Sequence, residues 1–424
     1  MWFYNTQNKL EKVTFKSAVT NGLAKDGGLF FPENLPCFSS KDLLKLAELT
    51  SHERFFSILY PFVQGCISEK DFSTIIEKTF NFEIKVCSID QNIKTLELFH
   101  GPTLAFKDFG AKFLANVLSH LNNNELTTIL TATSGDTGAA AAQAFFNLED
   151  FEVVVLYPKN KVSYIQQKFF TTLGNNVRTF AIDGTFDDCQ ALIKKAVNDE
   201  DVLLKRKLNS ANSINICRLM AQICYFFEAY FTLRHELRDK KLIFSVPSGN
   251  FGNVTAAMMA TKMGLPVQKI IAATNSNDTV SRYLSTNKWE PNETIMTLSN
   301  AMDVSNPSNW IRTDLLRQEN FCEFICESVN EEQTKKSIRM LRNKGYISEP
   351  HAAIAYQSLE NHLEDDHLGV FLSTAHPIKF KSVVEEILDE SLIVPKIVKE
   401  LMVKPSQEET LGTDYVPFKK KLLS

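Results

Sequence analysis

The 424-residue sequence has no run of 18 or more apolar residues, so it offers no candidate for a membrane-spanning helix. Its start, MWFYNTQNKLEKV, lacks the basic segment followed by an apolar core that marks a secretory signal. None of the eight cysteines forms a C-x-x-C pair, which leaves zinc and thioredoxin-type redox sites without support. These absences predict a cytoplasmic protein with no metal and no membrane partner.

An excess of basic charge is also missing, because 46 Lys and Arg against 50 Asp and Glu give a net charge of −4. Non-specific nucleic-acid binding needs a basic surface, so we expect no nucleic-acid partner. Apolar and charged residues make up 44% and 23% of the chain, as in ordinary globular proteins. Any binding of anions must therefore depend on a local site.

Glycine is scarce, at 16 of 424 residues, or about 4% against roughly 7% in average proteins. Six of these glycines nevertheless gather in three short segments that also carry polar or reactive residues. They are Gly101, Gly110, Gly135, Gly138, Gly249 and Gly252. Glycine lets the backbone approach a ligand closely, so these segments are the first place to look for a site.

The pattern of apolar residues over most of the chain is typical of an α/β protein. From about residue 95, β-rich apolar runs alternate with helical patterns, which predicts βαβ units and mainly parallel sheets. The first 95 residues look mainly helical, because apolar residues recur at 3- and 4-residue spacing. The expected strands are 127–133, 151–158, 177–183, 241–247, 269–275 and 368–374. The expected helices between them are 138–147, 186–198, 212–233 and 253–263. We interpret residues 378–424 as a charged, partly helical region with a solvated basic tail.

Parallel sheets bind ligands at the carboxyl ends of their strands, so the strand-exit loops are informative. The first loop is SGDTG, residues 134–138, where hydroxyls and amides precede an alanine-rich helix. The second is SGNFGN, residues 248–253, whose run of backbone N–H groups at a helix start suits a phosphate. It matches neither the G-x-G-x-x-G nor the P-loop spacing. The third is STAHP, residues 373–377, where the hydroxyls could bind a ligand or only nearby backbone. The first loop could likewise be an ordinary capped helix start.

Lys107 is the candidate reactive residue. It lies in LELFHGPTLAFKDFGAKF, among Phe99, Leu104, Phe106 and Phe109. An apolar setting lowers the pKa of a lysine toward the neutral amine, which can form a Schiff base with an aldehyde. An exposed lysine with an aromatic neighbour is the plainer interpretation. A phosphate-binding loop downstream favours the reactive one, because an aldehyde cofactor with a phosphate tail needs both.

Together these segments resemble the pyridoxal-phosphate enzymes of the tryptophan-synthase-β-like fold, and among them the threonine synthase family. The resemblance also includes residues 4–32 and spans almost the whole chain. The motifs that carry it are FHGPTLAFKDFG (99–110), TATSGDTGAA (131–140), NSANSINICR (209–218), VPSGNFGN (246–253), AATNSNDT (272–279), LSNAMDVSNPSNW (298–310), SEPHAA (348–353) and TAHPIKF (374–380).

The resemblance implies pyridoxal 5′-phosphate as cofactor and Lys107 as the catalytic lysine that bonds to it. The cofactor phosphate would lie on the backbone amides of the glycine loop, and Thr374 would hydrogen-bond the pyridine nitrogen. The implied phosphate-loop residues are Gly249, Asn250, Phe251, Gly252 and Asn253. The implied substrate-binding residues are Thr103, Ser134, Gly135, Asp136, Thr137, Arg218 and Lys379.

The implied reaction is the conversion of O-phospho-L-homoserine and water to L-threonine and phosphate, the last step of threonine biosynthesis. The substrate adds a second dianionic phosphate, so cations are needed beyond the glycine loop. Arg218 and Lys379 are the favoured candidates, with Lys159 and Lys161 as weaker alternatives. His351 and His376 are expected to make structural hydrogen bonds. Residues 299–310 would be either a loop that closes over the substrate or a plain surface loop.

The expected architecture has two open, mainly parallel sheets with a cofactor cleft between them. The expected divisions are an N-terminal segment 1–95, a large cofactor domain 96–120 with 236–424, and a smaller inserted domain 121–235.

We expect a monomer or a homodimer. Two rivals remain open at this point: another enzyme of the same fold, such as a serine/threonine dehydratase or a β-replacing synthase, and a non-catalytic phosphometabolite-binding protein.

Overall fold

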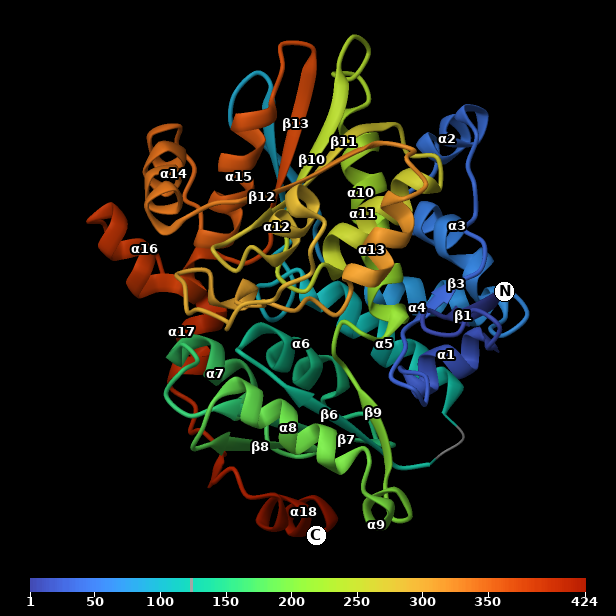
Figure 1. Cartoon of the computed structure of the whole chain (residues 1–424), viewed down its shortest axis with the longest axis vertical. Helices are drawn as coiled ribbons and strands as arrows, with labels where there is room; N and C mark the ends of the chain where they lie inside the picture. The colour runs from blue at the N-terminus through green and yellow to red at the C-terminus, as the bar shows by residue number, and fades with distance from the viewer. Residues whose placement is uncertain (123–124) are drawn as a thin grey trace.

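The structure is a computed structural model that describes residues 1–122 and 125–424. Two large β-sheets dominate it, one in the upper and one in the lower half of Figure 1. Both are mainly parallel and carry helices on their faces, which confirms the expected α/β fold class.

The larger sheet has six strands in the order β12-β11-β10-β13-β5-β4, and only β4 runs antiparallel to its neighbour. Helix α15 packs on one face against β10, β11 and β13, and α11 packs on β10 and β11. Figure 1 shows α15 and α11 on opposite sides of these strands. The strands are β4 (Lys85–Ser88), β5 (Ile93–Glu97), β10 (Lys241–Pro247), β11 (Val267–Thr274), β12 (Glu323–Ser328) and β13 (His367–Ser373). The associated helices are α5 (Lys107–Leu121), α10 (Ile216–Leu233), α11 (Gly252–Lys262), α12 (Thr279–Thr286), α13 (Trp310–Arg317), α14 (Glu331–Asn343) and α15 (Pro350–His362).

The smaller sheet has the order β14-β8-β7-β6-β9, and all its neighbours are parallel. Its central strands are buried almost throughout, which explains why they read as continuous apolar runs rather than alternating ones. The strands are β6 (Thr127–Ala132), β7 (Phe151–Pro158), β8 (Val177–Ile182), β9 (Lys207–Ser210) and β14 (Glu409–Leu411). The helices are α6 (Asp136–Phe145), α7 (Tyr164–Thr171), α8 (Phe186–Ala196) and α9 (Glu200–Leu203).

The N-terminal segment is helical as predicted in α2 (Ser40–Ala47), α3 (Ser51–Val63) and α4 (Glu69–Thr79), with a further helix α1 (Phe15–Asn21). It also holds an antiparallel sheet that the sequence pattern did not indicate, formed by β1 (Trp2–Asn5), β2 (Lys12–Thr14) and β3 (Phe30–Pro32). These strands are three or four residues long, too short to show a two-residue period in the sequence.

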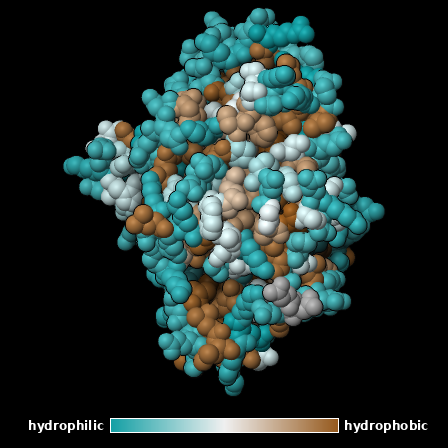
Figure 2. Space-filling model, turned by 90° about the vertical axis from the view of Figure 1, so that its right-hand side faces the viewer, coloured by the Kyte–Doolittle hydropathy of each residue, from teal (hydrophilic) through white to brown (hydrophobic). Residues whose placement is uncertain are grey.

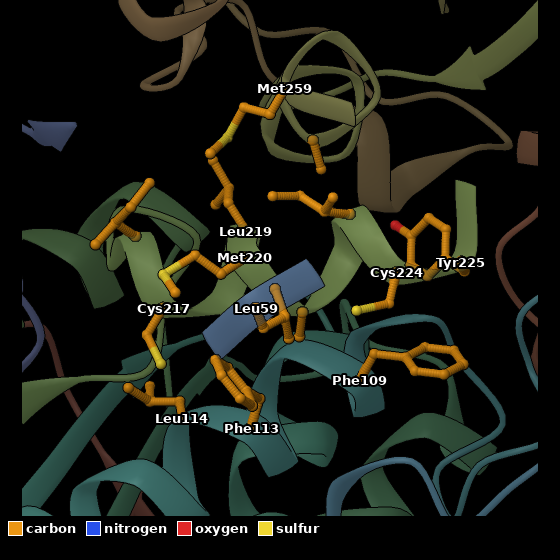
Figure 3. Packing of buried hydrophobic residues seen from close by; sticks show 14 of the residues in the cluster. Leu59, Phe109, Phe113, Leu114, Cys217, Leu219, Met220, Cys224, Tyr225 and Met259 are labelled. Atoms are coloured by element: carbon orange, nitrogen blue, oxygen red, sulfur yellow. The ribbon is translucent and has the colours of Figure 1, made fainter. Parts of the chain in front are cut away.

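A continuous hydrophobic core holds the helices that carry the site. Figure 3 shows Phe109 and Phe113 of α5 facing Cys224 and Tyr225 of α10, with Leu59 of α3 between them. Helices α5 and α10 pack so closely that a Cβ at Gly110 would lie 2.8 Å from the carbonyl oxygen of Arg218. The positions of Lys107 and Arg218, at the N-terminal parts of these two helices, are therefore fixed by the same core.

The C-terminal region returns to the smaller sheet, which differs from the expected assignment of residues 236–424 to the large domain. After η2 (Pro377–Phe380), α16 (Lys381–Leu388) and α17 (Lys396–Met402), strand β14 pairs with β8. Helix α18 (Tyr415–Leu423) then packs on α8, with Phe418 and Leu422 fully buried. The predicted solvated tail is thus wrong for its apolar side chains, which supply core to the smaller sheet.

The surface in Figure 2 is mostly hydrophilic, with hydrophobic residues exposed in its lower part, which is the side of the smaller sheet. No helix among the described residues is long and apolar enough to cross a membrane. All eight cysteines are described and all are free thiols.

Candidate active site between the two sheets

Lys107 begins helix α5, directly after the turn that follows β5. The Phe106 amide donates to the Thr374 carbonyl at 2.8 Å, and Ala105 forms a bridge with Ala375. These contacts hold Lys107 beside the exit of β13. Burial lowers the pKa of the Lys107 amine to about 8; the nearby Arg218 and Lys379 act in the same direction, while Asp136 opposes them. Lys107 is thus partly buried beside charged groups rather than in the purely apolar setting that the sequence predicted, and its amine still has a lowered pKa.

The loop between β10 and α11 leads into the N-terminus of α11, and no side chain of the N-cap residue caps that terminus. Phe251, the N-cap residue of α11, has a left-handed backbone with φ of 59° and caps no amide with its side chain. Among the described residues, the amides of Gly249, Asn250 and Phe251 have no hydrogen-bond acceptor. A Cβ at Gly249 would lie 2.7 Å from the Met302 Cα, so only glycine fits there. Free amides at a helix N-terminus form a ready anion site.

Three side chains from two distant segments support this loop, and the sequence did not single them out individually. Ser213 Oγ accepts a hydrogen bond from Asn250 Nδ2 at 2.8 Å, and Asn309 Nδ2 donates to the Asn250 carbonyl at 3.1 Å. Arg312 is fully buried, donates to Asn309 Oδ1 at 2.8 Å, and binds the Phe30 and Ile214 carbonyls at 2.6 and 2.9 Å. The signal in the sequence that could have indicated Ser213 is its place in the motif NSANSINICR (209–218).

Residues 299–310 pack on the glycine loop and are not a plain surface loop. The Ser308 amide donates to Asn250 Oδ1 at 2.5 Å, and Met302 closes over Gly249. Ser299, Met302 and Asn309 are buried. Whether this segment moves when a substrate binds stays a prediction.

The SGDTG loop lies between β6 and α6, as predicted. The Thr133 hydroxyl accepts hydrogen bonds from the amides of Gly135 and Gly138, both at 2.9 Å, and so shapes the turn. Gly135 has φ of 139° and packs on Gln166, where a Cβ would come within 2.7 Å. Ser134 and Thr137 stay partly exposed, and their hydroxyls have no partner among the described residues. They remain available to a ligand.

Asp136 and Lys379 form a buried ion pair that joins the two sheets. Asp136 begins α6, after β6 of the smaller sheet, and Lys379 lies in η2, after β13 of the larger sheet. The Nζ–Oδ1 distance is 2.6 Å, and the side chains are 0% and 4% exposed for Lys379 and Asp136. Burial acts to raise the pKa of Asp136, but Lys379 and Lys107 outweigh it and hold that pKa well below its ordinary value.

Arg218 is buried in the first turn of α10, and not all of its hydrogen-bond donors are paired within the described residues. Its Nη1 binds the Ala211 carbonyl, whereas its buried Nε has no partner among the described residues. Burial lowers the pKa of Arg218 to about 10, so it remains a cation at neutral pH. An unsatisfied buried donor in a native protein calls for an explanation, and a bound anion would supply one. Lys159 and Lys161, the weaker candidates, are exposed.

Thr103 holds the turn before Lys107 in place. Its hydroxyl and amide donate to the Asp108 carboxylate at 2.6 and 2.8 Å, and its carbonyl accepts from Lys379 Nζ at 2.7 Å. Its hydroxyl proton is therefore already engaged. Thr374 is 6% exposed, and its hydroxyl has no partner among the described residues.

Both histidines singled out in the sequence make local hydrogen bonds. His376 Nδ1 accepts from the Ile378 amide at 3.1 Å, and burial lowers the pKa of His376 to about 4. His351 Nδ1 pairs with Glu349, the N-cap residue of α15. A structural role for both stays the better interpretation.

The site therefore combines an amine of lowered pKa, a free-amide anion site, and two buried cations. Known proteins share these segments. Residues 94–373 match the family described as pyridoxal-phosphate dependent enzyme, residues 2–80 match threonine synthase N terminus, and residues 352–420 match threonine synthase, C-terminal. The last two matches lie largely outside residues 94–373.

Similar proteins align over the full length. The threonine synthase of Buchnera aphidicola subsp. Baizongia pistaciae is 48% identical, and the alignment covers 100% of both chains. The crystal structure of threonine synthase from Escherichia coli superimposes with a TM-score of 0.95 at 47% identity, covering 100% of this chain and 99% of that one. A structure titled as PLP-bound threonine synthase from Brucella melitensis gives a TM-score of 0.93 at 31% identity, with 100% and 99% covered.

Proposed function

The chain belongs to the threonine synthase family of pyridoxal-phosphate-dependent enzymes, and we propose that it converts O-phospho-L-homoserine and water to L-threonine and phosphate. One observation carries this proposal. Lys107, the free amides of the glycine loop, and the buried cations Arg218 and Lys379 lie together at the junction between the two sheets. A substrate with its own phosphate, acting with a phosphate-bearing cofactor, needs two such anion sites. The rival enzymes of the same fold do not explain the matched N- and C-terminal family segments.

The cofactor is pyridoxal 5′-phosphate. The residues present fit it, because the glycine loop offers, at the start of α11, backbone amides with no acceptor among the described residues. The amides from Gly249 to Asn253 would hold its phosphate, Lys107 would bond to it, and Thr374 would offer its free hydroxyl to the ring nitrogen. When bound, the cofactor supplies an electron sink for the bonds next to the substrate amine.

The protein's own residues bind, orient and transfer protons. Ser134, Thr137 and the backbone amides of Asp136 and Thr137 would bind the substrate carboxylate, because these donors lie at a helix start and have no partner among the described residues. Arg218 and Lys379 would bind the substrate phosphate and stabilise it as it leaves Cγ.

Lys107 would be the positioned base. Its amine would remove the proton at Cα and then one at Cβ, and a proton is delivered to Cγ after phosphate leaves. The oxygen of a water molecule then adds at Cβ as a hydroxyl group, and Lys107 would return a proton to Cα, which completes threonine. A pKa near 8 suits this work, since the amine can both accept and return protons near neutral pH.

Turnover tests the function directly. The holoenzyme given O-phospho-L-homoserine should release threonine and inorganic phosphate in equal amounts. Release of a 2-oxo acid in place of threonine would indicate dehydratase chemistry. Binding without either product would indicate a non-catalytic phosphometabolite-binding protein.

The lowered pKa of Lys107 predicts how its capture of the cofactor depends on pH. Only the neutral amine attacks the aldehyde, so with a pKa of about 8 the capture rate should rise about tenfold from pH 7 to 9 and then level off. Over this range Asp136 stays ionised and Arg218 stays mostly protonated. Stopped-flow mixing of apoenzyme with pyridoxal phosphate measures the rate, and N-acetyl-lysine corrects for ionisation of the cofactor itself. A corrected rate that still climbs about tenfold per pH unit above pH 9 would mean an ordinary lysine.

We also propose a cytoplasmic location, supported by the eight free cysteines.

A further inference from the structure

The buried ion pair between Asp136 and Lys379 is the starting point. Lys379 Nζ has two partners, the Asp136 carboxylate at 2.6 Å and the Thr103 carbonyl at 2.7 Å. Both side chains are almost completely buried. A cation that is assigned to a substrate anion is thus already neutralised by an acidic group of the protein.

Asp136 has one partner on each side of the junction: Gln166 lies beside the smaller sheet, and Lys379 follows a strand of the larger sheet. Gln166 Nε2 donates to Asp136 Oδ1 at 2.9 Å, and Gln166 lies on α7, which packs on α6 beside the smaller sheet. Lys379 instead comes from the larger sheet, and its carbonyl accepts from Ser163 Oγ at 3.1 Å. The ion pair between Asp136 and Lys379 can therefore break while Gln166 still donates a hydrogen bond to the Asp136 carboxylate at the start of α6.

Electrostatics favours a change of this kind. The substrate adds a carboxylate and a dianionic phosphate to a buried site that already holds an ionised carboxylate. Like charges at short distance in a poorly hydrated site repel strongly. An oxyanion of the substrate meets the full charge of Lys379 when Asp136 gives up that contact, because the carboxylate neutralises the lysine while they are paired.

We propose that Asp136 holds the place of the substrate phosphate on Lys379: it neutralises the lysine in the free holoenzyme, and the phosphate replaces it on binding. Asp136 is therefore a positioning residue that keeps Lys379 buried and oriented before the substrate arrives. When the phosphate replaces Asp136 on Lys379, the ion pair that joins the two sheets is also broken. This inference rests on the proposed function, because it assigns Lys379 to the substrate phosphate.

Inorganic phosphate, a product of the reaction, is the probe. Asp136→Asn removes the competing charge but keeps a group that can accept from Lys379 and Gln166. We expect the holoenzyme of the Asp136→Asn variant to bind phosphate about tenfold more tightly than the wild type in titration calorimetry. Asp187→Asn is the matched control, because it removes one negative charge from the first turn of α8, where Asp187 is exposed. Its phosphate affinity should equal that of the wild type.

A double variant shows whether the gain passes through Lys379. In a Lys379→Met background, Asp136→Asn should no longer tighten phosphate binding. Equal or weaker phosphate binding by the folded Asp136→Asn variant would overturn the proposal, as would a gain that persists without Lys379.

A crystal structure of the wild-type holoenzyme with phosphate tests the same point without any substitution. Lys379 should contact the phosphate and no longer Asp136; an intact ion pair beside bound phosphate would contradict the exchange. These outcomes separate from the proposed function. Threonine release by a wild-type enzyme that shows no exchange refutes only the inference, and exchange without threonine release refutes only the function.

Discussion

Replacing Lys107 with alanine is expected to lower kcat/KM by at least about 10⁴-fold, the largest effect of any single substitution. The variant loses both the amine that bonds to the cofactor and the base that moves protons at Cα and Cβ. The cofactor should still bind through its phosphate, because the free amides from Gly249 onward are untouched. Borohydride reduction followed by mass spectrometry should find the cofactor covalently attached in the wild type and absent from the variant.

Lys112→Ala is the matched control for this experiment. Lys112 lies on the same helix α5, but its amine donates to the exposed Asn81 and is not among the residues assigned to the cofactor or the substrate. Its removal should leave both turnover and covalent attachment intact. Covalent attachment that survives in the Lys107→Ala variant would show that another lysine is the reactive one.

Replacing Arg218 with alanine is expected to lower kcat/KM for O-phospho-L-homoserine by about 10²- to 10³-fold while the amount of bound cofactor stays unchanged. The guanidinium is buried, stays charged at neutral pH, and has an Nε without a partner among the described residues. Its removal leaves Lys379 as the only assigned cation for the substrate phosphate. Steady-state kinetics and cofactor absorbance measure the two quantities separately.

Two comparisons make the Arg218 result specific. Arg218→Lys should recover only part of the activity, because a lysine keeps the charge but loses the planar fork. Arg206→Ala, which removes an arginine paired with Glu152 at 3.2 Å just before β9, should leave the kinetics as in the wild type. Unchanged kinetics in the Arg218→Ala variant would remove this residue from the substrate site.

The expected strands of the two large sheets lie where the sequence placed them. The run at 127–133 becomes β6 and the run at 241–247 becomes β10. Both are buried parallel strands, whose apolar runs between turn residues give a strong local signal. β12 was not predicted, because each of its residues is at least partly exposed and it follows the polar stretch at 317–320. β14 was missed because three residues carry no readable period.

The sequence by itself determined the chemistry-bearing groups. Lys107 among aromatic residues, and the glycine loops at strand exits, are readable because turn chemistry and strand patterns are local properties of neighbouring residues. Only the tertiary structure decided which of these groups meet. The pair between Asp136 and Lys379, and the support of Asn250 by Ser213 and Asn309, join segments far apart in the chain. Such contacts depend on how helices and sheets pack around the core, which no local pattern records.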